Sequence, residues 1–205
     1  MKICFATNNA KKIEEVTAAI PSTIQLVSLK EIGCTEEIPE TTQTIEGNSE
    51  QKAMYVYENY NTNCFADDTG LEIEALDGEP GVDSAMYADK IVGSYRDSKE
   101  NMKLVLKNLS EKASEGNTNR NAQFKTVFTL VIDGKKHQFE GIIKGKIINE
   151  PTGEDGFGYD PIFIPNGYEK TFAQMSLSEK NKISHRAIAT RKLVTFLNEI
   201  NKVEP

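Results

Sequence analysis

The chain has 205 residues, of which 38% are hydrophobic and 27% are charged, and its formal net charge is -7 at pH 7. This length is short for two full domains, and the negative charge disfavours a large surface for duplex nucleic acid, which needs clustered Lys and Arg. No apolar run approaches the ~20 residues that span a bilayer, and residues 1–6 lack the pattern of a signal peptide. We expect a single domain over residues 1–205, with neither nucleic-acid nor membrane partners.

The cysteines indicate the compartment. Cys4, Cys34 and Cys64 are odd in number and have no CxxC spacing, which argues against both a disulfide framework and a zinc site. A reducing cytoplasm fits this usage best.

The first third of the chain predicts two successive strand and helix pairs. The expected elements are a buried strand at 2–6, a helix at 11–20, a short strand at 24–28, an acid-rich connection at 30–44 and a helix at 45–60.

The remainder is dominated by a hairpin signal at Asp133-Gly134 with long arms. The expected elements are a strand at 63–67, an alternating strand at 71–76, a turn at 77–81, a helix at 99–109, a mobile surface loop at 110–121, hairpin arms at 122–132 and 135–148, a short helix near 178 and a longer one at 184–198. The predicted fold class is α/β, with a mixed, elongated central sheet that contains the long antiparallel hairpin, helices on its faces, and two lobes around a central cleft.

The loop at 6–12, Ala-Thr-Asn-Asn-Ala-Lys-Lys, joins the first strand to a helix N-terminus, where backbone N–H groups favour an anion. Thr7 and Asn9 add donors and Lys12 adds a positive charge. A P-loop is excluded because the GxxxxGK[ST] pattern is absent. The alternative is that Asn8 or Asn9 simply caps the helix.

Asp67 and Asp68 follow a short apolar run at the expected carboxyl end of a strand. Adjacent strand residues point to opposite faces, so one carboxylate could hold Mg²⁺ or activate a water while the other serves the structure. The alternative is a solvated acidic strand end. Glu40 and Glu46 could add metal-binding oxygens, and Lys52 lies in the following helix.

The run at 153–163, Gly-Glu-Asp-Gly-Phe-Gly-Tyr-Asp-Pro-Ile-Phe, combines what a pocket for a flat polar ring needs. Phe157 and Tyr159 offer ring faces beside flexible glycines, and Asp160 offers an acceptor that Pro161 is expected to hold in an extended conformation. The alternative is a surface turn with two aromatic rings packed into the core.

Ser184 reads as a helix N-cap, which places His185 and Arg186 in the first turn. A cation is unfavourable there, which indicates that Arg186 has another purpose. The other histidine, His137, lies mid-hairpin and fits a surface position.

Five motifs in order closely resemble the inosine triphosphate pyrophosphatase family, which removes non-standard purine nucleotides from the nucleotide pool. They are Ala-Thr-Asn-Asn-Ala-Lys-Lys at 6–12, Ala-Asp-Asp-Thr-Gly-Leu at 66–71, Pro-Gly-Val-Asp-Ser-Ala at 80–85, Gly-Phe-Gly-Tyr-Asp-Pro-Ile-Phe at 156–163 and Glu-Lys-Asn-Lys-Ile-Ser-His-Arg at 179–186. The resemblance runs from residue 3 to about residue 195. It implies a homodimeric hydrolase that converts XTP, ITP and dITP to the monophosphate and pyrophosphate with Mg²⁺, by attack of water on the α-phosphorus.

The resemblance also implies roles for individual residues. Asp68 would be the catalytic base and a metal ligand, and Glu40 the second metal carboxylate. The triphosphate would be held by Thr7, Asn8, Asn9, Lys12, Lys52 and Thr69. The base and sugar would be bound by Phe157, Gly158, Tyr159, Asp160, Lys180, His185 and Arg186, with Phe157 stacked on the purine and Arg186 facing O6, so that the 6-amino group of adenine leaves a buried donor unpaired.

The chain departs from the family pattern at Gly47, where a Glu is frequent, and at Met86, where an Arg is frequent. Two alternatives to the predicted activity stay open. One is a pyrophosphatase for another nucleotide, such as a pyrimidine or methylated NTP, and the other is a non-catalytic nucleotide sensor that keeps the pocket.

Overall fold

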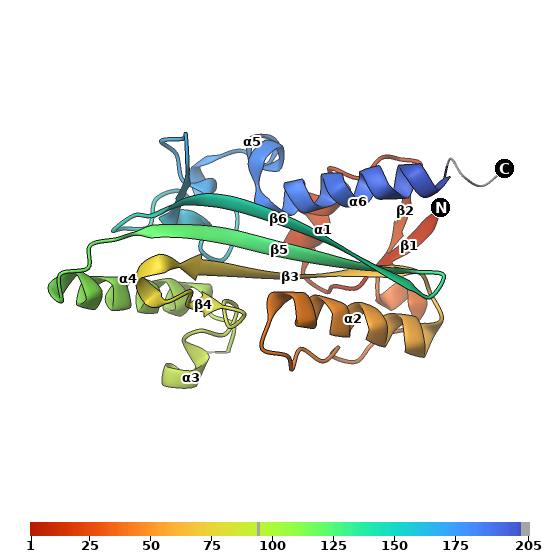
Figure 1. Ribbon diagram of the computed structural model, residues 1–205, viewed down its shortest axis with the longest axis horizontal. Coiled ribbons are helices and arrows are strands. Elements are labelled where there is room, and N and C mark those ends of the chain that lie inside the picture. Colours follow the sequence, from red (N-terminus) through yellow and green to blue (C-terminus); the bar gives the residue numbers. More distant parts are fainter. Residues whose placement is uncertain (94, 202–205) are drawn as a thin grey trace. The chain divides into compact units, whose positions relative to one another are not determined.

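The structure is a computed structural model that describes residues 1–93 and 95–201. Hydrogen bonds order its sheet as β2-β1-β3-β5-β6-β7, with β4 paired to β3 (Figure 1). The strands are β1 (Lys2–Phe5), β2 (Gln25–Val27), β3 (Cys64–Ile73), β4 (Pro80–Gly81), β5 (Asn121–Ile132), β6 (Lys135–Ile147) and β7 (Phe163–Pro165). The α-helices are α1 (Ala10–Thr17), α2 (Ile45–Tyr60), α3 (Asp89–Val92), α4 (Ser98–Ser114), α5 (Leu177–Ile183) and α6 (His185–Asn201).

The chain divides into two compact units, within each of which most contacts are made. Unit 1 comprises residues 1–68, 126–141 and 184–205, and unit 2 comprises residues 69–125 and 142–183. Strands β3, β5 and β6 contribute residues to both units. Each unit has apolar clusters of its own, so each is described by itself.

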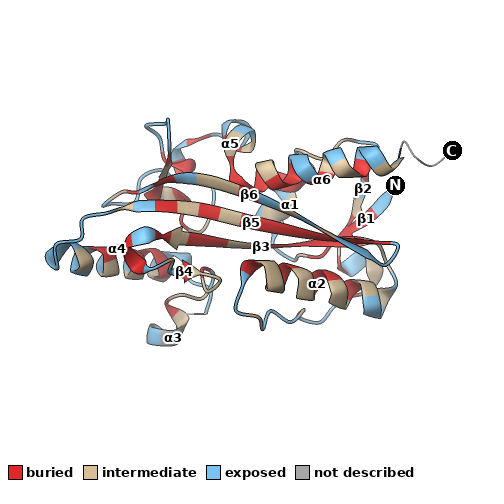
Figure 2. Ribbon diagram, viewed as in Figure 1, coloured by how far each residue is buried: buried red, intermediate tan, exposed pale blue. Residues whose placement is uncertain are grey.

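In unit 1, β1 pairs in parallel with both β2 and β3, and its side chains alternate between the two faces of the sheet. Ile3, Phe5 and Phe65 pack on one face with apolar residues of α1 and α6. Cys4 and Cys64 pack on the other face with Ala53 and Val56 of α2. Helices α1 and α6 therefore cover one face and α2 covers the other, and the unit 1 residues of the central strands β3 and β5 are buried (Figure 2).

Unit 2 is built around a second core. Leu71 and Ile73 of β3 and Phe124 of β5 pack there against Val105 and Leu109 of α4. Three aromatic rings pack against one another within this core, and Phe124 and Phe163 meet edge to face with their centroids 4.7 Å apart. The opposite side chains of β3 and β5 in this unit are polar, as a sheet covered on one face requires.

The structure confirms the mixed α/β class, the hairpin and the helix at 45–60. Asp133 and Gly134 both have positive φ, 49° and 75°, as a two-residue hairpin turn needs. Helix α2 begins after Thr44, whose hydroxyl accepts a hydrogen bond from Gly47 N, and ends at Asn61 in the left-handed region. The two lobes with a cleft, and the single domain, stay predictions.

Three local predictions are wrong. Residues 63–67 and 71–76 are not separate strands, because β3 continues through Asp67-Asp68-Thr69-Gly70, so the two aspartates lie inside a strand and not at its end. The predicted loop at 110–121 is shorter in the structure. Residues 110–114 belong to α4, which extends to Ser114, and residue 121 begins β5.

The third error concerns Asp160, which begins a 3-10 turn, Asp160–Ile162, and is not extended. The turn is closed by Ile162 N donating to Tyr159 O at 3.0 Å. The short helix α3 has no counterpart among the predicted elements. Across residues 1–93 and 95–201, the helices are all too short or too polar to cross a membrane.

Candidate active site

Asp67 and Asp68 point to opposite faces of the sheet in unit 1. Along β3, Asp67 has the same parity as Phe65, which packs on the α1/α6 face, whereas Asp68 has the parity of Cys64 and Ala66, which pack on the α2 face. Their ion pairs follow this division, as predicted for adjacent strand residues. Two charged clusters result, which we call the α1/α6-face cluster and the α2-face cluster.

The α1/α6-face cluster consists of Lys12, Glu15, Asp67 and Arg186. Lys12 Nζ lies 3.0 Å from Asp67 Oδ2, and Arg186 Nη2 lies 3.6 Å from the same oxygen. Arg186 Nη1 also donates to Glu15 Oε2. Burial alone would raise the pKa of Asp67, but Lys12, Arg186 and Lys52 lower it to about 2. Asp67 is therefore ionised at neutral pH and pairs with two cations, Lys12 and Arg186.

The α2-face cluster consists of Glu40, Lys52 and Asp68. Lys52 Nζ donates to Glu40 Oε1 and lies 3.9 Å from Asp68 Oδ1. Burial raises the pKa of Asp68 to about 6, against the attraction of Lys52 and Lys12 and with the added repulsion of Glu40 and Asp67. Burial lowers the pKa of Lys52, but Asp68, Glu40 and Asp67 outweigh that effect and raise it.

The two clusters differ in charge. Lys12 and Arg186 balance Glu15 and Asp67, whereas Lys52 faces both Glu40 and Asp68, which leaves one negative charge in excess. Asp68 Oδ2 is moreover buried without a hydrogen-bond partner. An unsatisfied carboxylate oxygen in a net negative cluster is what a hard divalent cation requires, so Asp68 and Glu40 fit Mg²⁺.

The loop at 6–12 positions Lys12. Asn9 Oδ1 accepts hydrogen bonds from Lys11 N at 3.0 Å and Lys12 N at 3.3 Å, so Asn9 caps α1, as the alternative for this loop had it. Thr7 Oγ1 accepts from Asn9 N at 3.2 Å, and Asn8 is exposed. Burial lowers the pKa of Lys12 despite Asp67, and Lys52 and Arg186 lower it further. Lys12 and Arg186 thus lie close to Asp67 and Lys52 lies close to Asp68, so three cations are available where phosphate charge could be neutralised.

In unit 2, Asp160 organises the predicted aromatic loop. Its Oδ2 accepts from Phe157 N at 2.8 Å and from Lys180 Nζ at 2.6 Å. The same ammonium lies 5.0 Å from the centroid of the half-buried Phe157 ring. Gly156, with a φ of 76°, is required here, because a Cβ at this position would lie 2.1 Å from Asp160 Oδ2.

Three further predicted residues also lie in unit 2. Tyr159 is buried in the core with its hydroxyl donating to Ser84 O at 2.8 Å, which is the packing arrangement named as the alternative for this loop. Gly158 has a φ of 62° and is half-buried. Thr69 lies in β3 and is half-buried.

His185 and Arg186 belong to unit 1, so the residues predicted for base and sugar are divided between the units. Ser184 Oγ accepts from Ala187 N at 3.2 Å, consistent with the predicted N-cap. Arg186 is 1% exposed and forms ion pairs with Glu15 and Asp67. These ion pairs account for a cation in the first turn of a helix, where the helix dipole disfavours positive charge. Its predicted role at O6 of the base stays a prediction.

Sequence reasoning missed several residues that shape these clusters. Glu15 follows Lys12 by three residues on α1, so the two share a helix face, and this spacing was the available signal. Gln51 and Asn48, which contact the segment that carries Glu40, gave no signal because both contacts depend on how that segment folds back.

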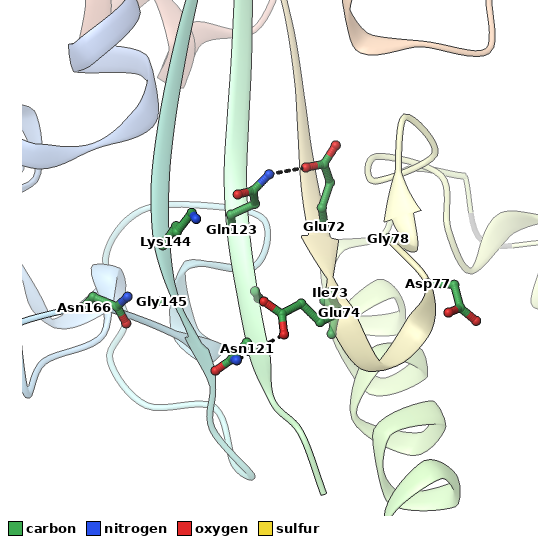
Figure 3. A pocket seen from close by; sticks show the side chains of 11 residues that line it. Glu72, Ile73, Glu74, Asp77, Gly78, Asn121, Gln123, Lys144, Gly145 and Asn166 are labelled. Carbon is green, nitrogen blue, oxygen red and sulfur yellow. Dashed lines mark hydrogen bonds between the residues drawn. The ribbon is translucent and has the colours of Figure 1, made fainter. Parts of the chain in front are cut away.

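A cavity of about 500 Å³ lies in unit 2, on the polar face of β3, β5 and β6 (Figure 3). Two of its carboxylates, Glu72 and Glu74, already have amide partners, since Gln123 donates to Glu72 at 2.6 Å and Asn121 donates to Glu74 at 3.1 Å. The residues lining it include none of those predicted for the nucleotide. This cavity is therefore separate from the predicted site residues of unit 2.

Fold and site together define an α/β protein with a net negative carboxylate cluster and buried lysines paired to neighbouring carboxylates. Comparison with known proteins agrees with this class. The profile of the Ham1 family matches residues 3–196. The chain is 54% identical over 196 residues to a Flavobacterium psychrophilum protein and 43% identical over 195 residues to a Bacillus subtilis protein, both named dITP/XTP pyrophosphatase. These matches cover 96% and 94% of this chain and 98% and 95% of the relatives.

Solved structures are similar over the same length. The Ham1 protein of Staphylococcus aureus superimposes with a TM-score of 0.85 at 35% identity, covering 97% of this chain and 99% of that one. A nucleoside-triphosphatase / dITP/XTP pyrophosphatase from Mycobacterium abscessus superimposes with a TM-score of 0.74 at 38% identity, covering 96% and 99%. The chain belongs to the Ham1 family, which confirms the resemblance drawn from the five motifs.

Proposed function

We propose that the protein hydrolyses non-standard purine nucleoside triphosphates, XTP, ITP and dITP, to the monophosphate and pyrophosphate, and so removes them from the nucleotide pool. The observation that carries this proposal is the α2-face cluster, with its excess negative charge and the unsatisfied Oδ2 of Asp68. The names of the relatives supply the substrate class.

Asp68 is suited to act as the base. With a pKa raised to about 6, its carboxylate is ionised at neutral pH and basic enough to take a proton from an attacking water at Oδ2. That water would attack the α-phosphorus, and pyrophosphate would leave. Lys52, held between Asp68 and Glu40, and Lys12, held by Asp67, would neutralise the phosphate oxygens.

Asp68 and Glu40 would hold Mg²⁺, which, when bound, withdraws negative charge from the phosphates. No group of three or more His, Cys, Asp or Glu side chains suited to a metal gathers within residues 1–93 and 95–201. Two carboxylates are nevertheless a usual number for Mg²⁺ at a nucleotide site, because phosphate and water would supply the remaining oxygens.

The base and sugar would be recognised by the loop of unit 2. The half-buried Phe157 ring offers a stacking face, and the Lys180 ammonium beside it is fixed by Asp160. His185 and Arg186 are further candidates for contacts to O6 of the base. We also propose that the enzyme acts as a homodimer in the cytoplasm, where its three buried, free cysteines stay reduced.

The test is a turnover panel of ITP, XTP, dITP, ATP, GTP, CTP, UTP and a methylated purine NTP, with Mg²⁺ and with EDTA. We expect fast release of pyrophosphate from ITP, XTP and dITP alone, and loss of turnover in EDTA. Faster hydrolysis of ATP, CTP or UTP than of ITP would contradict the proposal. Tight ITP binding without turnover would favour a nucleotide sensor.

A further inference from the structure

Glu40 lies in a segment with little backbone support. Residues 33–44, all of them described, form neither helix nor strand, and the side chain of Glu40 is 32% exposed. A carboxylate on such a segment would be mobile unless other contacts fix the backbone beside it. Its ion pair with Lys52 restrains the side chain and is not itself a contact of the backbone.

Helix α2 holds that backbone through two amide side chains. Gln51 contacts Thr41 twice, since its Oε1 accepts from Thr41 N at 2.8 Å and its Nε2 donates to Thr41 Oγ1 at 2.8 Å. Asn48 contacts Thr42 twice, since its Oδ1 accepts from Thr42 N and from Thr42 Oγ1, both at 2.9 Å. Together with Lys52, these residues occupy one face of the helix, three and four positions apart.

Helix formation does not account for these contacts. Thr44 already caps α2, because its hydroxyl accepts from Gly47 N at 3.0 Å. Gly47 permits the close approach of Thr42, since a Cβ at position 47 would lie 2.5 Å from Thr42 Oγ1. The glycine at position 47, where the family often has a glutamate, therefore leaves space for Thr42 to contact Asn48.

We propose that Gln51, assisted by Asn48, is a positioning residue that holds Glu40 where it can share one divalent cation with Asp68. This inference rests on the proposed function, because it takes Glu40 and Asp68 as the pair that binds Mg²⁺. Four hydrogen bonds to the two residues that follow Glu40 fix its backbone, and Lys52 aligns its carboxylate. The order of the segment comes from side chains of α2.

The test compares Gln51→Met with the wild type. Methionine keeps the length of the side chain and removes both hydrogen bonds to Thr41. The matched control is Asn59→Ala on the same helix, whose amide donates to Tyr55 O and does not contact the segment. Glu40→Gln serves as the reference for loss of the carboxylate itself.

Two measurements are made on each protein. Amide hydrogen exchange of residues 37–44 in EDTA reports the order of the segment without metal. The Mg²⁺ concentration that gives half-maximal ITP hydrolysis reports the metal site. In Gln51→Met we expect faster exchange at residues 41 and 42, an about tenfold higher Mg²⁺ requirement, and recovery of kcat at high Mg²⁺. Asn59→Ala should change neither.

These outcomes distinguish the role of Gln51 from that of Glu40. Faster exchange with an unchanged Mg²⁺ requirement, or no change in either measurement, would overturn the positioning role of Gln51. An unchanged Mg²⁺ requirement in Glu40→Gln would instead remove Glu40 from the metal site, and the proposed function would need a different carboxylate. A lower melting temperature with both measurements unchanged would reduce Gln51 to a structural contact.

Discussion

The two faces of β3 in unit 1 carry neighbouring aspartates whose surroundings shift their pKa values in opposite directions. On the α1/α6 face, Asp67 lies in a cluster of two anions and two cations, and its pKa is lowered to about 2. On the α2 face, Asp68 lies in a cluster with one negative charge in excess, and its pKa is raised to about 6. One strand thus presents an ion-paired carboxylate on one side and a carboxylate with an unsatisfied oxygen on the other, because neighbouring residues of a strand point to opposite faces.

The largest expected effect comes from Asp68→Asn. If Asp68 is the base, turnover of ITP should fall by roughly 10²–10⁴-fold, since an amide cannot accept the proton. ITP binding, followed by equilibrium dialysis, should persist because Lys12 and Lys52 are unchanged. Normal turnover in this variant would assign the chemistry to another group.

Asp67→Asn should instead damage stability. Removal of this anion leaves Lys12 and Arg186 with less compensation in a buried position, a change that costs about 3–5 kcal/mol in comparable sites. Urea unfolding at pH 7 in EDTA measures it. An equally stable Asp67→Asn protein would show that the α1/α6-face cluster is not held by this carboxylate.

The pH dependence of stability should distinguish the same two residues. The pKa of Asp68 is raised in the folded protein, so this residue imposes no penalty on folding below pH ~4, where it is protonated in both states. As pH rises from ~4 through about 6, the free energy of unfolding falls by roughly 3 kcal/mol because the folded protein resists ionisation of Asp68. Asp68→Asn should therefore be more stable than the wild type at pH 7 without divalent ions, and the gain should vanish near pH 4.

Asp67 has the opposite sign. Its pKa is lowered, so its contribution to stability is present above pH ~4 and is lost as pH falls toward 2. Melting temperatures of the two variants across pH 3 to 8 give the comparison. Parallel curves for Asp67→Asn and Asp68→Asn would contradict the separation of the two faces.

A smaller effect is expected from Gly141→Ala, which would crowd α6 on the α1/α6 face. A Cβ at position 141 would lie 2.0 Å from His185 O and 2.7 Å from Ala189 N, so the first turn of α6 would have to move. Overpacking of this kind costs about 1–3 kcal/mol. Urea unfolding measures the loss, and an unchanged midpoint would show that α6 can move without penalty.

The sequence by itself determined the elements whose signals are local. Apolar periodicity predicted the helix at 45–60, and Asp133-Gly134 predicted the hairpin, because both signals depend on neighbouring residues. The five motifs determined the family. Alternation along a strand also predicted that Asp67 and Asp68 would have different partners.

Only the tertiary structure decided what those partners are. Three features depend on residues that are distant in sequence. Strand β3 continues through Asp67-Asp68, Glu15 forms an ion pair with Arg186, and Gln51 forms hydrogen bonds with the segment beside Glu40. Burial, which raises the pKa of Asp68 and removes solvent from Asp67, is a property of the packed sheet and its helices. The charges can be read from the sequence, but their balance depends on which face of the sheet each side chain reaches.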